Sequence, residues 1–313
     1  MLYGNYRFKC RFTSEARLPE YKGSTIRGVF GRALKQVVCA LKRQACPDCL
    51  LKNECLYPAV FEPHPAVKTT ENGGPATRPH PYVIQPPSDL KTIYPEAEPF
   101  AFNLLLFGPV NTRLSYFIYA LDGMGKIGIG KKTAGRRAAF CLEAVESSGR
   151  EIYTGGDRKL TDAASWTDLR FSPIKNRPNG NRTVTLKFET PLRLKHNNRL
   201  SPELPFHLLV RAMLRRSSAL LNHYDGGEPD LDYAGMVGRA WNVRTADSTL
   251  GWEDRRRYSL RQERSMMMGG LTGSITYEGD LEEYLPLIEF CAKVHLGKQT
   301  TFGMGRFTVE ELK

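Results

Sequence analysis

The sequence predicts an α+β fold made of two tandem ferredoxin-like (RRM-like) domains with antiparallel sheets, the first of which carries a cysteine-containing insertion. Two observations predict it. Both halves of the chain show the same order of strand-like and helix-like segments, and two Gly-rich segments repeat at a constant spacing. The length of 313 residues and the hydrophobic content of 41% allow each domain a core of its own. We place the domains at residues 1–180 and 181–313.

The first half opens with a strand, because apolar and basic residues alternate from Tyr6 to Phe12 as they do on a half-buried sheet. A helix capped by Ser24 follows, since apolar residues recur at helical spacing from Ile26 to Leu41. At about residues 39–97 we expect an insertion, Cys-rich and then rich in Pro and Gly. The pattern resumes with a strand at 101–107, a helix at 110–121 and a strand at 138–145.

The second half repeats this order. Its predicted elements are a strand at 183–188, a helix at 205–223, strands at 257–262 and 271–278, a helix at 281–292 and a closing strand at 306–310. The sequence of strand, helix, strand, strand, helix and strand is the split βαβ unit of ferredoxin-like folds.

An internal duplication is indicated by the segments GKKTAGRRAAFCLE, which begins at Gly130, and GKQTTFGMGRFTVE, which begins at Gly297. Five residues match without a gap at one offset of 167. A weaker similarity, at an offset of 176, relates the segments at the ends of the first strands of the two halves. The first set pairs Gly130, Lys131, Thr133, Phe140 and Glu143 with Gly297, Lys298, Thr300, Phe307 and Glu310, and the second pairs Phe12, Arg17 and Leu18 with Phe188, Arg193 and Leu194.

The charge balance predicts a polyanionic partner. Lys and Arg number 45 against 33 Asp and Glu, which gives a formal net charge of +12. The sequence shows neither an apolar run long enough to cross a membrane nor the apolar core of a signal peptide near its start, so we expect a cytoplasmic protein without a membrane partner.

Four of the seven cysteines lie within one short stretch, in which Cys46 and Cys49 form a CxxC pair. In a reducing compartment such clusters bind metal more often than they form disulfides, and four thiolates suit a tetrahedral zinc site. We predict a structural zinc site, with an iron–sulfur cluster or reduced thiols as alternatives. Its ligands would be Cys39, Cys46, Cys49 and Cys55.

Two basic regions are predicted to contact RNA. Glycines before the last strand let the main chain approach phosphates, and the neighbouring cations supply charge. An Arg-rich strand near residue 257 presents positive charge along one face. The predicted RNA-binding residues of these regions are Gly297, Lys298, Gly303, Gly305 and Arg306 in the loop, Lys131 in the matching first-half loop, and Arg255, Arg256, Arg257 and Arg261. The group Arg211, Arg215 and Arg216 is interpreted as a solvated helix face, with the alternative that Arg215, one turn beyond Arg211, contacts a phosphate of an RNA stem.

Several segments resemble the CRISPR precursor-RNA processing endoribonucleases of the RAMP superfamily. They are LPEYKGSTIRGVFGRAL at residues 18–34, CLYPAVFEP at 55–63, RYSLRQERSMMMGGLTGSITYEGDL at 257–281 and HLGKQTTFGMGRF at 295–307. The resemblance implies a cut that needs no metal ion or cofactor, in which the ribose 2′-hydroxyl attacks the adjacent phosphate to leave a 2′,3′-cyclic phosphate. It also implies CRISPR repeat RNA, as precursor and as mature guide RNA, as the partner, with CRISPR interference-complex subunits as further partners.

The sequence departs from this family at the general base. Many relatives carry a histidine near the start of the first helix, but residues 1–63 contain none. At that position we predict Tyr21 and Lys22 as catalytic residues and Arg27 as an RNA contact. His295 is the leading candidate for the base, because it directly precedes the Gly-rich loop and imidazole titrates near neutral pH.

Two other functions stay open from the sequence. The missing histidine favours a non-catalytic RAMP subunit that only binds guide RNA, whereas the two-domain architecture and the length of the resemblance favour the enzyme. A zinc-containing protein that binds DNA or has a structural role is the third interpretation, and a requirement for the ribose 2′-hydroxyl would exclude it.

Overall fold

The computed structural model describes residues 1–42, 44–62, 65–69, 75–171, 180–196, 199–200, 202–259 and 264–312. The chain divides into two compact units, Met1–Asp168 and Leu169–Lys313. The second unit begins upstream of the predicted boundary at residue 180, because Phe171 packs its ring against Phe290, with 6.3 Å between the centroids.

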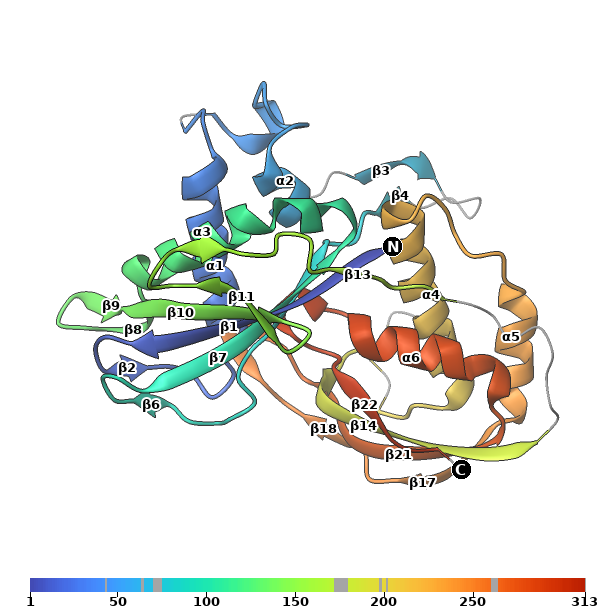
Figure 1. The fold of residues 1–313 in the computed structure, drawn as a ribbon. Coiled ribbons are helices and arrows are strands. Elements are labelled where there is room, and N and C mark those ends of the chain that lie inside the picture. The colour runs from blue at the N-terminus through green and yellow to red at the C-terminus, as the bar shows by residue number, and fades with distance from the viewer. Residues whose placement is uncertain are drawn as a thin grey trace. The chain divides into compact units, whose positions relative to one another are not determined.

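The first unit is a ferredoxin-like fold with an antiparallel sheet, as the sequence predicts (Figure 1). The sheet has the order β12-β11-β10-β1-β7-β5, and β13 pairs with β1. Its four central strands, β10-β1-β7-β5, are the fourth, first, third and second strands of the split βαβ unit. Their bounds are β1 (Leu2–Phe12), β5 (Tyr82–Gln85), β7 (Pro99–Phe107), β10 (Phe140–Ser147), β11 (Arg150–Thr154), β12 (Lys159–Leu160) and β13 (Thr167–Asp168).

Two helices, α1 (Gly23–Val38) and α3 (Leu114–Ile127), cover one face of this sheet (Figure 1). The apolar stripe of α1 buries Ile26, Phe30 and Leu34, and α3 adds Phe117 and Leu121 to the same core. Alternation along β1 sends Tyr6, Phe8, Cys10 and Phe12 into this core and leaves the basic residues between them outside it.

The second unit repeats the fold. Its antiparallel sheet has the order β17-β21-β14-β22, the second, third, first and fourth strands of the unit, and β18 pairs with β21. Helices α4 and α6 pack beside each other against it, with Phe206, Leu209, Tyr277 and Ile288 in the core. The bounds are β14 (Asn181–Leu192), α4 (Phe206–Tyr224), β17 (Arg244–Ser248), β18 (Gly251–Glu253), β21 (Gly270–Asp280), α6 (Leu285–Val294) and β22 (Phe307–Leu312).

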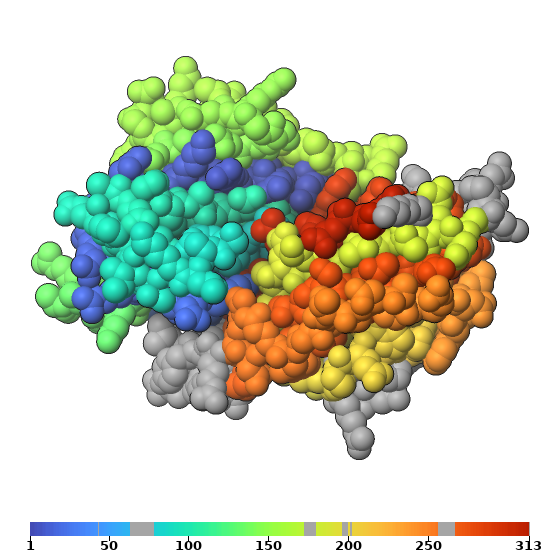
Figure 2. All heavy atoms as spheres, turned by 90° about the horizontal axis from the view of Figure 1, so that it is seen from below, coloured from blue at the N-terminus to red at the C-terminus, as the bar shows by residue number. Residues whose placement is uncertain are grey.

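One predicted strand of the second unit is wrong. The segment 257–262 was expected in the main sheet, but β19 (Arg256–Ser259) pairs with β20 (Arg264–Met267) in a separate hairpin. The second strand of the sheet is β17, whose residues are all exposed and therefore lack the apolar alternation that identifies a strand. Figure 2 shows the β17 and β18 region, in orange, at the surface of the second unit.

The remaining elements are short. In the first unit they are β2 (Ala16–Arg17), α2 (Leu56–Phe61), β3 (Pro65–Thr69), β4 (Pro75–Thr77), β6 (Ile93–Tyr94), β8 (Ile129–Thr133), β9 (Arg136–Ala138) and two 3₁₀ helices, Cys46–Asp48 and Gly108–Arg113. In the second they are β15 (Lys195–His196), β16 (Arg199–Leu200), α5 (Tyr233–Arg239) and 3₁₀ helices at Ala240–Asn242, Glu282–Tyr284 and Thr300–Phe302. Among the helices in the described ranges, none has the length and apolar character that a membrane span requires.

The duplication extends to backbone geometry. Gly130 and Gly297 have φ angles of +83° and +84°. A β-carbon at Gly130 would lie 2.4 Å from the Arg17 carbonyl oxygen, and one at Gly297 would lie 2.8 Å from the Arg193 carbonyl oxygen. Both positions therefore require glycine for the same reason, a close approach to the chain that leaves the first strand. Equivalent ion pairs join the first and last strands, Arg11 to Glu143 in one unit and Lys187 to Glu310 in the other.

Candidate functional site

The Gly-rich loop of the second unit runs from the end of α6 to β22 and is closed by main-chain hydrogen bonds. The Leu296 amide donates to the Gly305 carbonyl oxygen at 2.9 Å, and the Gly305 amide donates to the Pro191 carbonyl oxygen at 3.1 Å. A β-carbon at Gly305 would lie only 1.7 Å from the Leu296 carbonyl oxygen. Because Gly305 also has a φ of +69°, only glycine fits there.

A threonine on β14 fixes the far side of the loop. The Thr190 hydroxyl donates to the Gly303 carbonyl oxygen at 2.8 Å and accepts from the Arg306 amide at 2.9 Å. The Arg306 guanidinium pairs with the Glu189 carboxylate at 2.7 Å. The predicted RNA contact of Arg306 therefore competes with an ion pair inside the protein.

His295 does not lie where a general base is needed. Its side chain is 0% exposed, and its Nδ1 lies 3.0 Å from the Met304 carbonyl oxygen. Burial lowers its pKa to about 3, although hydrogen bonds to the main chain at Met304 and Gly303 favour the charged form. We correct the catalytic prediction, because a buried imidazole bonded to the loop cannot reach a ribose hydroxyl. His295 instead holds the loop closed.

Arg216 connects this loop to helix α4. Its guanidinium donates to the Val294 carbonyl oxygen at 2.8 Å and to the His295 carbonyl oxygen at 3.1 Å. These are the last carbonyl groups of α6, so Arg216 satisfies acceptors that the helix leaves unpaired. Burial lowers its pKa to about 10, and Arg216 therefore stays charged at neutral pH.

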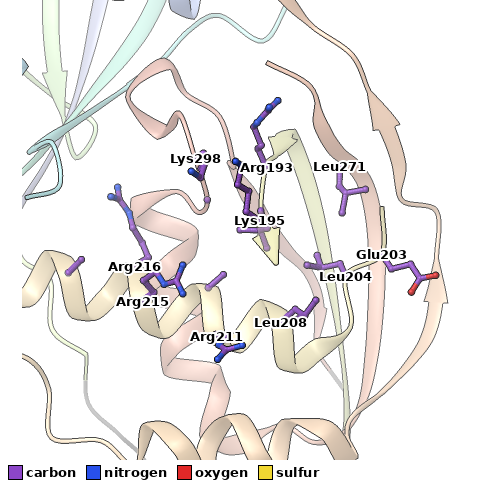
Figure 3. Close-up of a pocket in the computed structure, with 14 residues that line it drawn as sticks. Arg193, Lys195, Glu203, Leu204, Leu208, Arg211, Arg215, Arg216, Leu271 and Lys298 are labelled. Carbon is purple, nitrogen blue, oxygen red and sulfur yellow. The ribbon is translucent and has the colours of Figure 1, made fainter. Parts of the chain in front are cut away.

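A basic pocket of about 270 Å³ lies between α4, the Gly-rich loop and the chain after β14 (Figure 3). Figure 3 shows three arginines projecting from α4 and a lysine on the loop. Among the described residues that line it, one is acidic, Glu203, and six are cationic: Arg193, Lys195, Arg211, Arg215, Arg216 and Lys298. Leu194, Leu204, Leu208 and Leu271 form its apolar part.

Three of these cations have no partner among the residues that the structure describes. Within the described part of the chain, the exposed side chains of Arg211, Arg215 and Lys298 take part in no hydrogen bond or ion pair. The Lys298 amide donates to the Arg193 carbonyl oxygen at 3.0 Å, which fixes the start of its side chain beside the pocket. Like charges held together without counterions favour an anionic ligand such as a phosphate group.

The sequence did not identify this pocket. Arg211, Arg215 and Arg216 were interpreted as a solvated face, with a phosphate contact by Arg215 as the alternative. All three line the pocket, and the half-buried Arg216 also donates to the last carbonyl groups of α6. Their spacing along α4 was a usable signal, because residues four apart share one helix face. Nothing in the sequence around Arg193 and Lys195 indicated that they line a pocket, since their position there depends on how the chain turns after β14.

Lys22 also departs from its predicted role. The side chain is 1% exposed, and its ammonium donates to the carbonyl oxygens of Glu20 at 3.0 Å and Asp89 at 2.7 Å. It lies 3.2 Å from the Asp89 carboxylate and over the Tyr94 ring. An ammonium has three protons to donate, and these contacts occupy them. We correct the prediction: Lys22 joins the start of α1 to the segment before β6.

The other predicted residues of the first unit differ in exposure. Tyr21 is half-buried at the start of α1, and Lys131 is exposed on β8. Arg27 is half-buried, with its guanidinium 5.4 Å from the centre of the Phe61 ring. Its packing is therefore internal, and its RNA contact stays a prediction.

The Arg-rich segment is only partly described. Arg255 is half-buried and pairs with Glu253, and Arg256 and Arg257 lie on β19. Arg261 lies outside the described residues. Contact between this segment and RNA stays a prediction.

The structure does not support the predicted zinc site. Cys39 follows α1, Cys46 begins a 3₁₀ helix that Cys49 follows, and Cys55 precedes α2 with its Sγ 3.9 Å from the Val38 carbonyl oxygen. In the described ranges, no three side chains of His, Cys, Asp or Glu come close enough together to hold a metal ion. As arranged, the four thiols do not fit a tetrahedral site.

Known proteins resemble both units. Residues 1–165 match the AF_1859_N N-terminal domain family, and residues 186–307 match the family described as CRISPR-associated endoribonuclease Cas6. An uncharacterized protein of Archaeoglobus fulgidus is 25% identical over 307 residues, which cover 97% of this chain and 96% of that protein.

Solved structures share the fold along the whole chain. The Thermus thermophilus Cas6 TTHB231, solved as a product complex, has a TM-score of 0.56 at 15% identity and covers 98% of this chain and 99% of its own. The product complex of a second Cas6, TTHA0078, has a TM-score of 0.53 at 16% identity over 99% of this chain and 100% of its own. The match of residues 1–165, more than half of the chain, shows that the chain belongs to the AF_1859_N N-terminal domain family, and its second unit is similar to the CRISPR-associated endoribonuclease Cas6 family.

Proposed function

We propose that this protein cleaves CRISPR precursor RNA within the repeat, without a metal ion, to give mature guide RNAs. The Cas6 family supports the coarser statement, an RNA-cleaving enzyme of CRISPR transcripts. In the proposed reaction the 2′-oxygen forms a bond to the adjacent phosphorus and the bond from phosphorus to the 5′-oxygen breaks. The products are a 2′,3′-cyclic phosphate and a 5′-hydroxyl, so one proton leaves the 2′-hydroxyl and one joins the departing oxygen.

The observation that carries the proposal is the basic pocket. Arg211, Arg215 and Lys298 line it without partners among the described residues, and a phosphodiester supplies a negative charge to pair with them. The Gly-rich loop holds Lys298 in place through its main chain, so binding RNA requires little ordering of this part of the site. The pocket fixes the register of the RNA backbone, which positions the phosphate to be cut.

Tyr21 is the proposed catalytic residue in the first unit. Of the three residues predicted as catalytic it is the one whose side chain is not fully buried. A phenol is a hydrogen-bond donor at neutral pH, so it suits the orientation and polarisation of the scissile phosphate rather than removal of a proton. Replacement by Phe removes this donor and keeps the ring.

A cleavage assay tests the proposal. The protein is incubated in EDTA with repeat RNA and with a copy that carries one 2′-deoxynucleotide 5′ of the cut. We expect one cut in the first RNA, none in the second, and a cyclic phosphate at the new 3′ end. Tyr21→Phe should lower the single-turnover rate about 100-fold, within the range of one acid–base or oxyanion contact. Cutting of both RNAs, or cutting abolished by EDTA, contradicts the mechanism.

The repeat RNA, as precursor and as mature guide, is the proposed partner. Transfer of the product to CRISPR interference-complex subunits stays a prediction, and co-purification of such subunits with the RNA-loaded protein tests it.

A further inference from the structure

An exposed tryptophan and a histidine form a stacked aromatic pair in the second unit. The Trp241 side chain is 67% exposed, in the 3₁₀ helix that follows α5. Its ring stacks on the imidazole of His207 near the start of α4, with 3.5 Å between the centroids and 12° between the planes. A large, flat aromatic surface in contact with water is a surface on which another ring can stack.

The element that carries Trp241 is firmly anchored. The Arg239 guanidinium donates two hydrogen bonds of 2.8 Å to the Glu283 carboxylate and one of 2.9 Å to the Asp232 carboxylate. The Tyr284 hydroxyl donates to the Met236 carbonyl oxygen at 2.8 Å. The element therefore presents the indole at a fixed place, and stacking on it requires little ordering of the protein.

The stacked pair lies beside the basic pocket. His207 is four residues before Arg211 on α4, so the two side chains are neighbours on one helix face. The next residue, Leu208, lines the pocket together with Arg211. An aromatic surface next to unpartnered cations is the combination that binds single-stranded nucleic acid, because bases stack while phosphates pair with the cations.

We propose that Trp241, supported by His207, is a stacking platform for an unpaired base of the RNA whose phosphates occupy the basic pocket. This inference rests on the proposed function, because it requires RNA in that pocket. The charge favours RNA over an apolar protein segment as the occupant: Arg211 and Arg215 are exposed cations on the same helix.

Fluorescence of Trp241 tests the platform directly. The double variant Trp166→Phe and Trp252→Phe leaves Trp241 as the single tryptophan. We expect repeat RNA to quench its emission and inorganic polyphosphate to leave it unchanged, because only RNA brings a base. Equal quenching by both polyanions, or none by bound RNA, overturns the proposal.

Affinity provides the second readout. Loss of one stacked base weakens binding about 5-fold to 150-fold, so we expect this change for Trp241→Ala, a smaller one for Trp241→Phe and an unchanged melting temperature for both. Trp252→Phe is the matched control, since Trp252 is also exposed but donates to the Asp254 carboxylate, which repels phosphate.

The outcomes separate this inference from the proposed function. If Trp241→Ala binds and cuts repeat RNA as the wild type does, the platform is overturned and the function stands. If Trp241→Ala loses only the binding of a CRISPR protein, the surface serves a protein and the platform is again overturned. If the wild type neither binds nor cuts repeat RNA, both proposals fail.

Discussion

His295 occupies a backbone conformation that belongs to glycine at the matching position of the first unit. Its φ and ψ are +59° and 154°, and those of Gly128, 167 residues earlier, are +77° and 158°. For a residue with a β-carbon this region is strained by about 1–3 kcal/mol. The contacts of the imidazole to the loop and of Arg216 to the His295 carbonyl oxygen offset the strain. Histidine at position 295 is therefore more strained in its backbone than glycine would be, but its side chain forms contacts that close the loop.

The first prediction concerns this histidine and acid stability. A free histidine takes up its proton near pH 6.5, and folded His295 does so only near pH 3. Between these values the unfolded chain binds more protons, so acid favours unfolding, and the stabilisation is fully present above pH 6.5. We expect His295 to contribute about 1.4 kcal/mol per pH unit to the loss of stability in this window.

Denaturant unfolding at a series of pH values measures that slope. His295→Asn removes the titrating group and keeps a short side chain with a hydrogen-bond donor, so its stability should fall less steeply with acid than that of the wild type. Parallel curves for the two proteins would mean that His295 is protonated in the folded state, contrary to its burial.

The chemical type of these side chains can be read from the sequence, but their burial in the fold could not be predicted from it. His295 and Lys22 have the chemistry that RNA cleavage needs and the spacing that suggests it. Their burial follows from other segments, since Met304 closes over His295 and Asp89 approaches Lys22 from a distant part of the chain. One sequence does not contain those distances, and both residues were therefore assigned to catalysis rather than to the packing they support.

At the scale of elements, the Gly-rich loop offers the second prediction. Gly305→Ala places a methyl group 1.7 Å from the Leu296 carbonyl oxygen, and the main chain has to move to relieve the clash. Lys298 then loses its position beside the pocket. We expect RNA affinity to fall at least tenfold, the effect of about 1.4 kcal/mol, in an equilibrium binding assay on repeat RNA.

Gly135→Ala is the matched control for this change. Gly135 has a φ of +79°, close to the +69° of Gly305, but a β-carbon there would meet no atom within 4 Å. The two variants therefore share backbone strain and differ in the clash. A similar loss of affinity in both would assign the effect to strain and not to the geometry of the loop.

Most elements could be predicted because apolar periodicity marks them. The helix predicted at 205–223 is α4 at Phe206–Tyr224, and the strand predicted at 271–278 is β21 at Gly270–Asp280. The second strand of each sheet was missed. β5 follows a Pro- and Gly-rich stretch that suggested a loop, and β17 is a polar, exposed strand that pairs along one side with β21. Only their hydrogen-bond partners identify them as strands.

At the scale of the whole molecule, the net charge of +12 would attract RNA to any part of the surface, whereas the proposed pocket would bind it at one place. The two contributions differ in how they respond to neutralising mutations. Charge spread over the surface acts through the long-range field, which salt screens as a whole. A cation that contacts a phosphate releases a counterion and adds a fixed amount to the salt dependence of binding.

The third prediction uses this difference. Removing Arg211, Arg215 and Lys298 together should lower the slope of log Kd against log salt by about 2, since each phosphate contact of a single strand contributes about 0.7. The control replaces three exposed cations of the first unit, Arg150, Arg158 and Lys159, and changes the net charge equally. Filter binding of repeat RNA over a range of salt concentrations measures both slopes. If the two triple variants lose the same slope, the pocket cations act only as part of the general field and the RNA backbone lies elsewhere.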